Sequence, residues 1–242
     1  MSRQVLTIAV RVINQLRRDR RTLALILVVP LVVMSIVGFS FPDESVLNYI
    51  APAMLTTLAL FFGFLLTGIS FLRERSQGTL ERLLVSPVTK LDIVVGYLFG
   101  FFIFALIQTF IILFFTIYVF NITYQGQLWE ILVFQVIVII GAVNLGIFIS
   151  TFARNEFQMV QFIPLIIVPQ MFLGGLLWPV EQMPDVLQWI SRVLPLTYGV
   201  DGIREIMLNG KHLLDVWVDL AVLVGFAVAA SMLAAIPLKK GG

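Results

Sequence analysis

The chain has 242 residues, of which 60% are hydrophobic and only 12% are charged, and its formal net charge at pH 7 is +2. A soluble domain is about half apolar and about a quarter charged, so this composition favours a membrane protein. The chain has no cysteine, which excludes disulfides and thiolate metal sites. Its basic residues flank apolar runs instead of forming one stripe, so we expect no nucleic-acid partner.

Residues 1–21 are predicted to form an amphipathic helix that lies on the inner leaflet of the membrane. Val5, Ile8, Val12, Ile13 and Leu16 recur near helical spacing, and arginines stand between them and after them. The alternative is a basic flank whose only role is to orient the first span.

Apolar runs without charge occupy most of the remaining sequence, and each is long enough to cross a bilayer as a helix. Helices are expected because lipid satisfies no backbone hydrogen bonds and the runs lack the alternation of barrel strands. The predicted fold class is therefore an all-α polytopic membrane protein, with one domain over residues 1–242. Its six predicted spans are 22–41, 51–72, 93–120, 131–152, 157–180 and 220–238.

The distribution of lysine and arginine predicts the orientation. With a cytoplasmic N-terminus, all basic residues except Arg192, Arg204 and Lys211 fall in cytoplasmic segments. The positive-inside rule then places both termini in the cytoplasm.

Local signals refine the ends of the spans. Thr89 and Asp92 are spaced as a capping box that begins the third span. Gly174 and Gly175 predict a break at the end of the fifth span. Between Pro184 and Pro195, an apolar pattern predicts one short amphipathic helix at the outer interface.

The sequence shows no catalytic or metal-binding arrangement, so we expect a protein that is not an enzyme and binds no cofactor. The predicted spans hold no Asp, Glu, Lys, Arg or His, which argues against proton-coupled carriers. The only histidine, His212, is interpreted as a surface residue. The phosphate-binding motif G-x-x-x-x-G-K-[ST] does not occur in these residues. The energy for any uphill transport would therefore come from another subunit.

The densest charge in the chain lies between the second and third spans, in the sequence R-E-R-S-Q-G-T-L-E-R-L-L-V-S-P from Arg73 to Pro87. Gly78 permits a sharp turn, and Thr79 can cap the helix that follows it. The leucines after Thr79 share one helical face. The pattern predicts a short amphipathic helix parallel to the membrane, which is either a docking surface or a simple interfacial connector.

This segment resembles the hallmark of ABC type-2 transporter permeases, most closely the daunorubicin-resistance and multidrug export branch. Residues 194–198 and 202–205, and the Gly-Gly and Trp-Pro pairs at 174–179, resemble the same family. The resemblance implies a pair of identical permeases in a prokaryotic cell membrane, surrounded by membrane lipids. Each permease would contact, through a coupling helix, a separate subunit that binds ATP and magnesium. The resemblance also implies a connecting helix over residues 3–21 and short outer helices over residues 178–200. The residues that it assigns to ATPase coupling are Arg73, Glu74, Arg75, Gly78, Thr79, Leu80, Glu81, Arg82 and Leu83.

The function that the resemblance implies is ATP-driven export of hydrophobic or amphipathic compounds such as drugs, antibiotics or lipids. Export of a lipid-linked polysaccharide is an alternative within the family, and a passive channel or membrane scaffold is an alternative from another class. Polar side chains within spans mark a possible path, although hydrogen bonding between helices is their commoner use. These candidates are Gln108, Gln135, Asn144 and Gln170.

Overall fold

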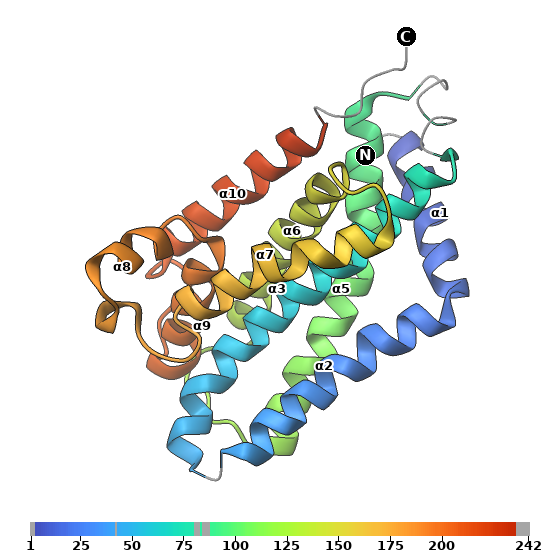
Figure 1. Cartoon of the computed structure of the whole chain (residues 1–242). Helices are drawn as coiled ribbons and strands as arrows, with labels where there is room; N and C mark the ends of the chain where they lie inside the picture. The colour runs from blue at the N-terminus through green and yellow to red at the C-terminus, as the bar shows by residue number, and fades with distance from the viewer. Residues whose placement is uncertain (1–2, 42, 80–82, 84–87, 236–242) are drawn as a thin grey trace.

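The computed structural model describes residues 3–41, 43–79, 83 and 88–235, and all regular structure in this part of the chain is helical (Figure 1). Leu80, Glu81 and Arg82, which belong to the predicted coupling helix, lie outside the described residues. The elements are α1 (Arg3–Arg18), α2 (Arg20–Ser40), α3 (Glu44–Ser76), α5 (Lys90–Phe120), α6 (Leu128–Ser150), α7 (Glu156–Leu173), a 3-10 turn η1 (Val180–Gln182), α8 (Asp185–Ser191), α9 (Pro195–Asn209) and α10 (Trp217–Ala235).

Six of the described helices, α2, α3, α5, α6, α7 and α10, are long and apolar enough to cross a membrane. They correspond in order to the six predicted spans, which confirms the all-α, multi-pass fold class. Thr89 and Asp92 form the predicted capping box at the start of α5. The predicted break is also present, because α7 ends at Leu173 and Gly175 has a positive φ of 77°.

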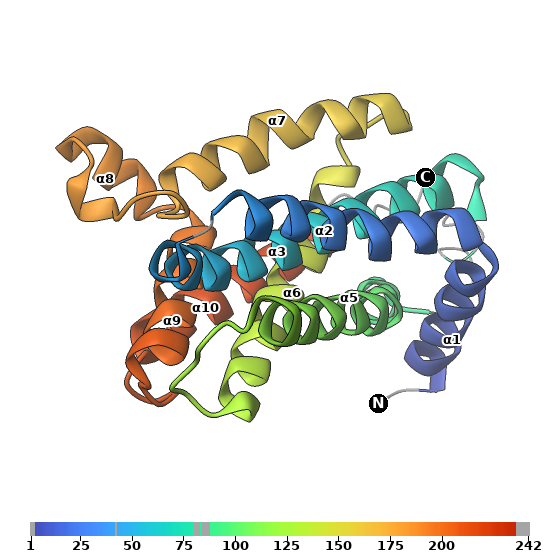
Figure 2. The ribbon, with the colours of Figure 1, turned by 90° about the horizontal axis from the view of Figure 1, so that it is seen from below.

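The central helix of the bundle is α3, which packs against α2, α5, α6, α7 and α9. In its most apolar stretch 83% of the residues are buried, against 17% for α7 and 22% for both α2 and α10. Figure 2 shows α7 on one side of α3, with α5 and α6 on the other. The helices α2, α7 and α10 therefore present the largest apolar surfaces to the surroundings.

The N-terminal helix α1 packs closely on α5. An added Cβ at Gly96 would lie 2.7 Å from the Ile8 Cβ, and one at Gly100 would lie 2.6 Å from the Val12 Cβ. These two glycines, four residues apart on one face of α5, let the helices approach. The apolar stripe of α1 is thus covered by protein. Most of the apolar face that predicts an interfacial helix packs against α5.

The segment between α7 and α10 contains a longer helix besides the short one that the apolar pattern predicts. The predicted helix is present as the short α8, but it is followed by α9, most of which is buried against α3. The guanidinium of Arg204 in α9 donates to the carbonyl oxygens of Gly175 at 2.6 Å, Leu176 at 3.0 Å and Tyr49 at 3.2 Å. It also lies over the Tyr49 ring, 3.9 Å from the centroid. Arg204 thereby joins α9 to α3 and to the end of α7.

Candidate coupling site

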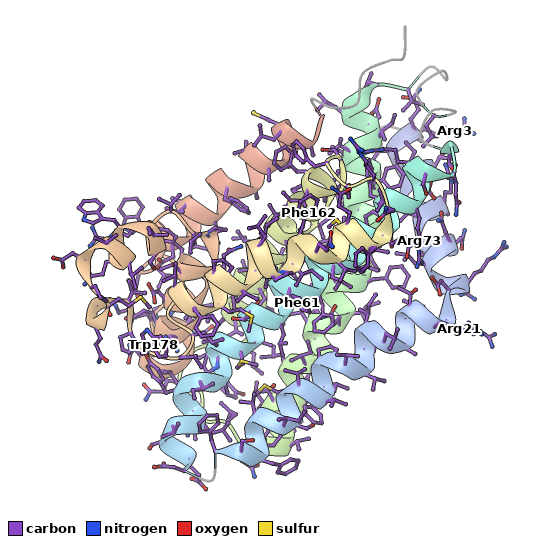
Figure 3. The ribbon with its side chains drawn as sticks, viewed as in Figure 1. Arg3, Arg21, Phe61, Arg73, Phe162 and Trp178 are labelled. Atoms are coloured by element: carbon purple, nitrogen blue, oxygen red, sulfur yellow. The ribbon has the colours of Figure 1, made fainter. Side chains whose placement is uncertain are left out.

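Arg73, in the last turn of α3, forms ion pairs with two other elements. Its Nε and Nη2 donate to the two carboxylate oxygens of Glu156 at 2.6 and 3.1 Å, and Glu156 is the first residue of α7. Its Nη1 donates to Asp19 Oδ2 at 3.2 Å. Figure 3 shows Arg73 at the same end of the molecule as Arg3 and Arg21, with Trp178 at the opposite end.

Asp19 is the N-cap of α2 and is held firmly in place. Its carboxylate accepts from the Thr22 hydroxyl at 2.6 Å and from the Thr22 amide at 3.1 Å. Hydrogen bonds from Thr22, followed by the charge of Arg73, hold the pKa of Asp19 below its usual value. The carboxylate therefore stays charged and fixes the start of α2 beside α3.

Glu74 points into the protein from the next position of α3. Only 3% of its side chain is exposed, and its Oε2 accepts from Arg11 Nη2 at 2.6 Å and from the Tyr97 hydroxyl at 2.9 Å. A buried carboxylate is tolerated when it is paired and hydrogen-bonded, as here. Glu74 thus joins α3 to both α1 and α5, and it offers little surface to another subunit.

Arg75 caps the neighbouring helix α6. Its Nη1 donates to the carbonyl oxygen of Thr151 at 2.6 Å and of Ser150 at 3.3 Å, and its Nη2 donates to that of Ala153 at 3.2 Å. The last carbonyls of a helix lack intrahelical partners and carry partial negative charge. A guanidinium at this position satisfies them and ties the end of α3 to the end of α6.

Consecutive residues on an α-helix point about 100° apart, and this spacing explains the arrangement at the end of α3. Arg73 faces α7 and the start of α2, Glu74 faces α1 and α5, and Arg75 faces α6. The last turn of α3 is therefore attached, through three adjacent side chains, to five other helices.

The helix α3 ends in a turn that the sequence predicts correctly. Gly78 has a φ of 68°, a left-handed conformation that glycine adopts without strain. Beyond Thr79, the only described residue before Val88 is Leu83, which packs against the cluster that α1 and α5 share. Leu83 and Val88 also line one side of an open groove of about 450 Å³, whose opposite side is Arg3, Gln4, Thr7 and Ile8 of α1.

The four candidate path residues are buried inside the bundle. Gln135 donates to Thr56 Oγ1 at 2.8 Å, which links α6 to α3, and Asn144 donates to the Ala227 carbonyl at 3.5 Å, toward α10. Gln170 donates to the Ile166 carbonyl of its own helix at 3.1 Å. The Gln108 side chain is 1% exposed, and neither its Nε2 nor its Oε1 has a hydrogen-bond partner among the described residues. For Gln135 and Asn144 the contacts are therefore those of helix packing.

His212 lies on the surface, with 65% of its side chain exposed, and its Nδ1 is 3.1 Å from Oε1 of the buried Glu130. Within the described ranges, no group of three or more histidines, aspartates and glutamates is placed to hold a metal ion. Sequence reasoning missed Arg11, Asp19, Tyr97 and Glu156 as partners of the α3 end. The one available signal was that Asp19 and Glu156 are isolated acids at the ends of apolar runs on the arginine-rich side.

Comparison with known proteins identifies the family. The sequence profile described as "ABC-2 type transporter" matches residues 3–208. The chain is 27% identical to "ABC transporter G family member 20" of Dictyostelium discoideum over 201 residues, which cover 82% of the chain and 28% of that protein. It is 33% identical to "Probable multidrug ABC transporter permease YbhR" of Escherichia coli (strain K12) over 165 residues, 68% of the chain and 44% of the relative.

A third relative is "Linearmycin resistance permease protein LnrN" of Bacillus subtilis (strain 168), 28% identical over 65% of the chain and 41% of the relative. The chain thus spans less than half the length of each of these three proteins. The profile match nevertheless covers most of the described structure, from the start of α1 to the end of α9. The chain belongs to the ABC-2 type transporter family.

Proposed function

We propose that this chain is the transmembrane subunit of an ATP-driven exporter of hydrophobic or amphipathic compounds. In this proposal two identical copies pair in the cell membrane with cytoplasmic termini, and each engages a separate subunit that binds ATP and magnesium. The names of the bacterial relatives, which refer to multidrug transport and linearmycin resistance, support an amphipathic cargo.

The observation that carries the proposal is the set of contacts at the end of α3. Arg73, Glu74 and Arg75 bind groups on α7, α1, α5, α6 and the N-cap of α2. A push on the segment after Ser76 would therefore reach several helices at once, as a coupling element requires. Closure of paired ATPases would supply the push, and the interface between the two permeases would change from inward-facing to outward-facing.

Within this mechanism the coupling residues have two kinds of role. Glu74 acts inside the chain, where it orients the end of α3, and Arg73 and Arg75 act in the same way toward α7 and α6. Gly78 and Thr79 shape the turn. Direct contact with the ATP-binding subunit is then assigned to the segment from Leu80 to Leu83, with Glu81 and Arg82 as its polar groups.

The test is ATP turnover by the assembled complex, with daunorubicin and linearmycin as probe cargoes. Glu81→Ala should lower the cargo-stimulated rate several-fold while the basal rate of the ATP-binding subunit is kept. Glu44→Ala is the matched control, because Glu44 is an exposed acid at the opposite end of α3. Full stimulation of ATP turnover by cargo in Glu81→Ala would contradict the coupling role assigned to Glu81. Failure to co-purify any ATP-binding subunit from native membranes would instead favour a passive channel or scaffold.

A further inference from the structure

Four arginines surround the short connection between α1 and α2, which we call the elbow. Arg17 and Arg18 are the last residues of α1, and Arg20 and Arg21 are the first residues of α2. All four side chains are exposed. None forms an ion pair with any residue in the described part of the chain.

The acid that lies among these arginines in the sequence, Asp19, is bound by other residues. Asp19 is the only acid before Asp43 in the sequence. Its Oδ1 accepts from the Thr22 amide, and its Oδ2 accepts from the Thr22 hydroxyl and from Arg73. Both carboxylate oxygens are therefore occupied, and the positive charge of the elbow is left without a counter-charge from its own segment.

The depth of the elbow fits the headgroup region of a bilayer. α2 is a candidate span that begins at Arg20, and the exposed apolar side chains of Leu25 and Val28 follow within two turns. Asp19 contacts Arg73, which lies inside α3 before the turn at Gly78. The elbow is thus level with the last turn of α3, before the turn at Gly78.

We propose that the elbow is a binding surface for anionic phospholipid headgroups. A guanidinium donates two parallel hydrogen bonds to a phosphate, and a basic cluster next to a span attracts anionic lipid. An arginine that only sets topology needs its charge alone, whereas phosphate binding also uses the planar geometry of the guanidinium. The inference does not depend on which cargo the protein moves or on whether it moves any.

The experiment is a titration of the purified full chain in detergent with phosphatidylglycerol and, separately, with phosphatidylcholine, followed by native mass spectrometry. The chain should bind phosphatidylglycerol more tightly, and Arg20→Gln/Arg21→Gln should weaken this binding by up to about fivefold for each arginine removed. Arg3→Gln/Arg154→Gln is the matched control, since both residues are exposed at the same end and the charge change is equal. The control should keep the preference.

Two further arms separate lipid binding from other roles of the elbow. Replacing all four arginines with lysine keeps the charge. The preference of this variant for phosphatidylglycerol should lie between those of the parent chain and of Arg20→Gln/Arg21→Gln. Because the charge is kept, the lysine variant also controls for folding. Inorganic phosphate at matched ionic strength should not displace phosphatidylglycerol. Displacement would mean that the elbow binds free anions, and it would overturn the proposal that the elbow binds lipid headgroups.

The proposal is also overturned if the elbow and control variants lose equal phosphatidylglycerol affinity. It is overturned as well if the elbow variants keep the lipid but lose an ATP-binding subunit on co-purification, because the arginines would then bind protein. A negative result in this titration leaves the exporter proposal standing, because that proposal is tested by ATP turnover. The two failures are therefore distinguishable.

Discussion

The guanidinium of Arg73 and the carboxylate of Glu156 form a two-pronged ion pair, with N–O distances of 2.6 and 3.1 Å, between the last turn of α3 and the first residue of α7. Their side chains are 34% and 52% exposed. An ion pair at this exposure contributes about 0.5–1 kcal/mol, which is enough to bias a balanced equilibrium but too little to determine the fold.

Breaking this pair should alter coupling more than stability. Arg73→Gln should lower cargo-stimulated ATP turnover of the complex by about two- to fivefold, which corresponds to the energy of one exposed ion pair. The exchange Arg73→Glu/Glu156→Arg should restore part of the loss, although Asp19 then faces a carboxylate. If the exchange is no better than Arg73→Gln alone, the pair has no part in coupling.

The buried Glu74 should matter for stability. Glu74→Ala leaves Arg11 and the Tyr97 hydroxyl without their partner, and we expect a loss of about 2 kcal/mol, less than for a fully buried pair because 36% of Arg11 is exposed. Glu74→Gln still accepts hydrogen bonds and should lose less. The apparent melting temperature in detergent measures the stability of both variants. Glu44→Ala, at an exposed position, is the control. An unchanged value for Glu74→Ala would contradict the assigned role.

The close approach of α1 and α5 should be sensitive to single methyl groups. Gly96→Ala and Gly100→Ala would each place a Cβ within 2.7 Å of a Cβ on α1, and neither of those Cβ atoms can rotate away. We expect each substitution to destabilise the chain by about 1–3 kcal/mol through overpacking. Gly225→Ala is the control, because nothing lies within 4 Å of a Cβ added there. Equal melting temperatures in all three variants would show that α1 does not pack on α5 as described.

The end of the bundle that contains Asp201, in α9, should have its own pH dependence. Burial, together with the carboxylates of Asp219 and Glu181, raises the pKa of Asp201 from its ordinary value of 3.8 to about 7. Between these values the folded chain holds a proton that the unfolded chain has released, so the free energy of unfolding falls as pH rises and levels off above about 7.

Asp201→Asn removes this titration. The variant should melt at a higher temperature than the parent chain above pH 7, and its melting temperature should change less between pH 5 and pH 8. Asp185→Asn is the control, because Asp185 is an exposed acid in the short helix α8. A parallel pH profile for the parent chain and Asp201→Asn would rule out this carboxyl as the source.

The spans could be predicted from sequence because a charge-free apolar run is a local property, and the capping box at Thr89 and the break at Gly174 are local too. The helix α9 was missed because its glycines and Arg204 look like loop composition, whereas in the structure Arg204 satisfies carbonyl groups on two other elements. The cluster at the end of α3 was recognised as charged, but its partners could not be predicted. Glu74 pairs with Arg11 and Tyr97 only because packing brings α1 and α5 beside α3.

The position of Arg73, Glu74 and Arg75 in one turn restricts how α3 can move. A rotation of α3 about its own axis would pull the three side chains away from their partners together. A tilt that carries the adjoining ends of α1, α5, α6 and α7 along with α3 breaks none of these contacts. The ends of these helices near Arg73 should therefore swing as one body, with the hinge nearer the opposite end of the bundle.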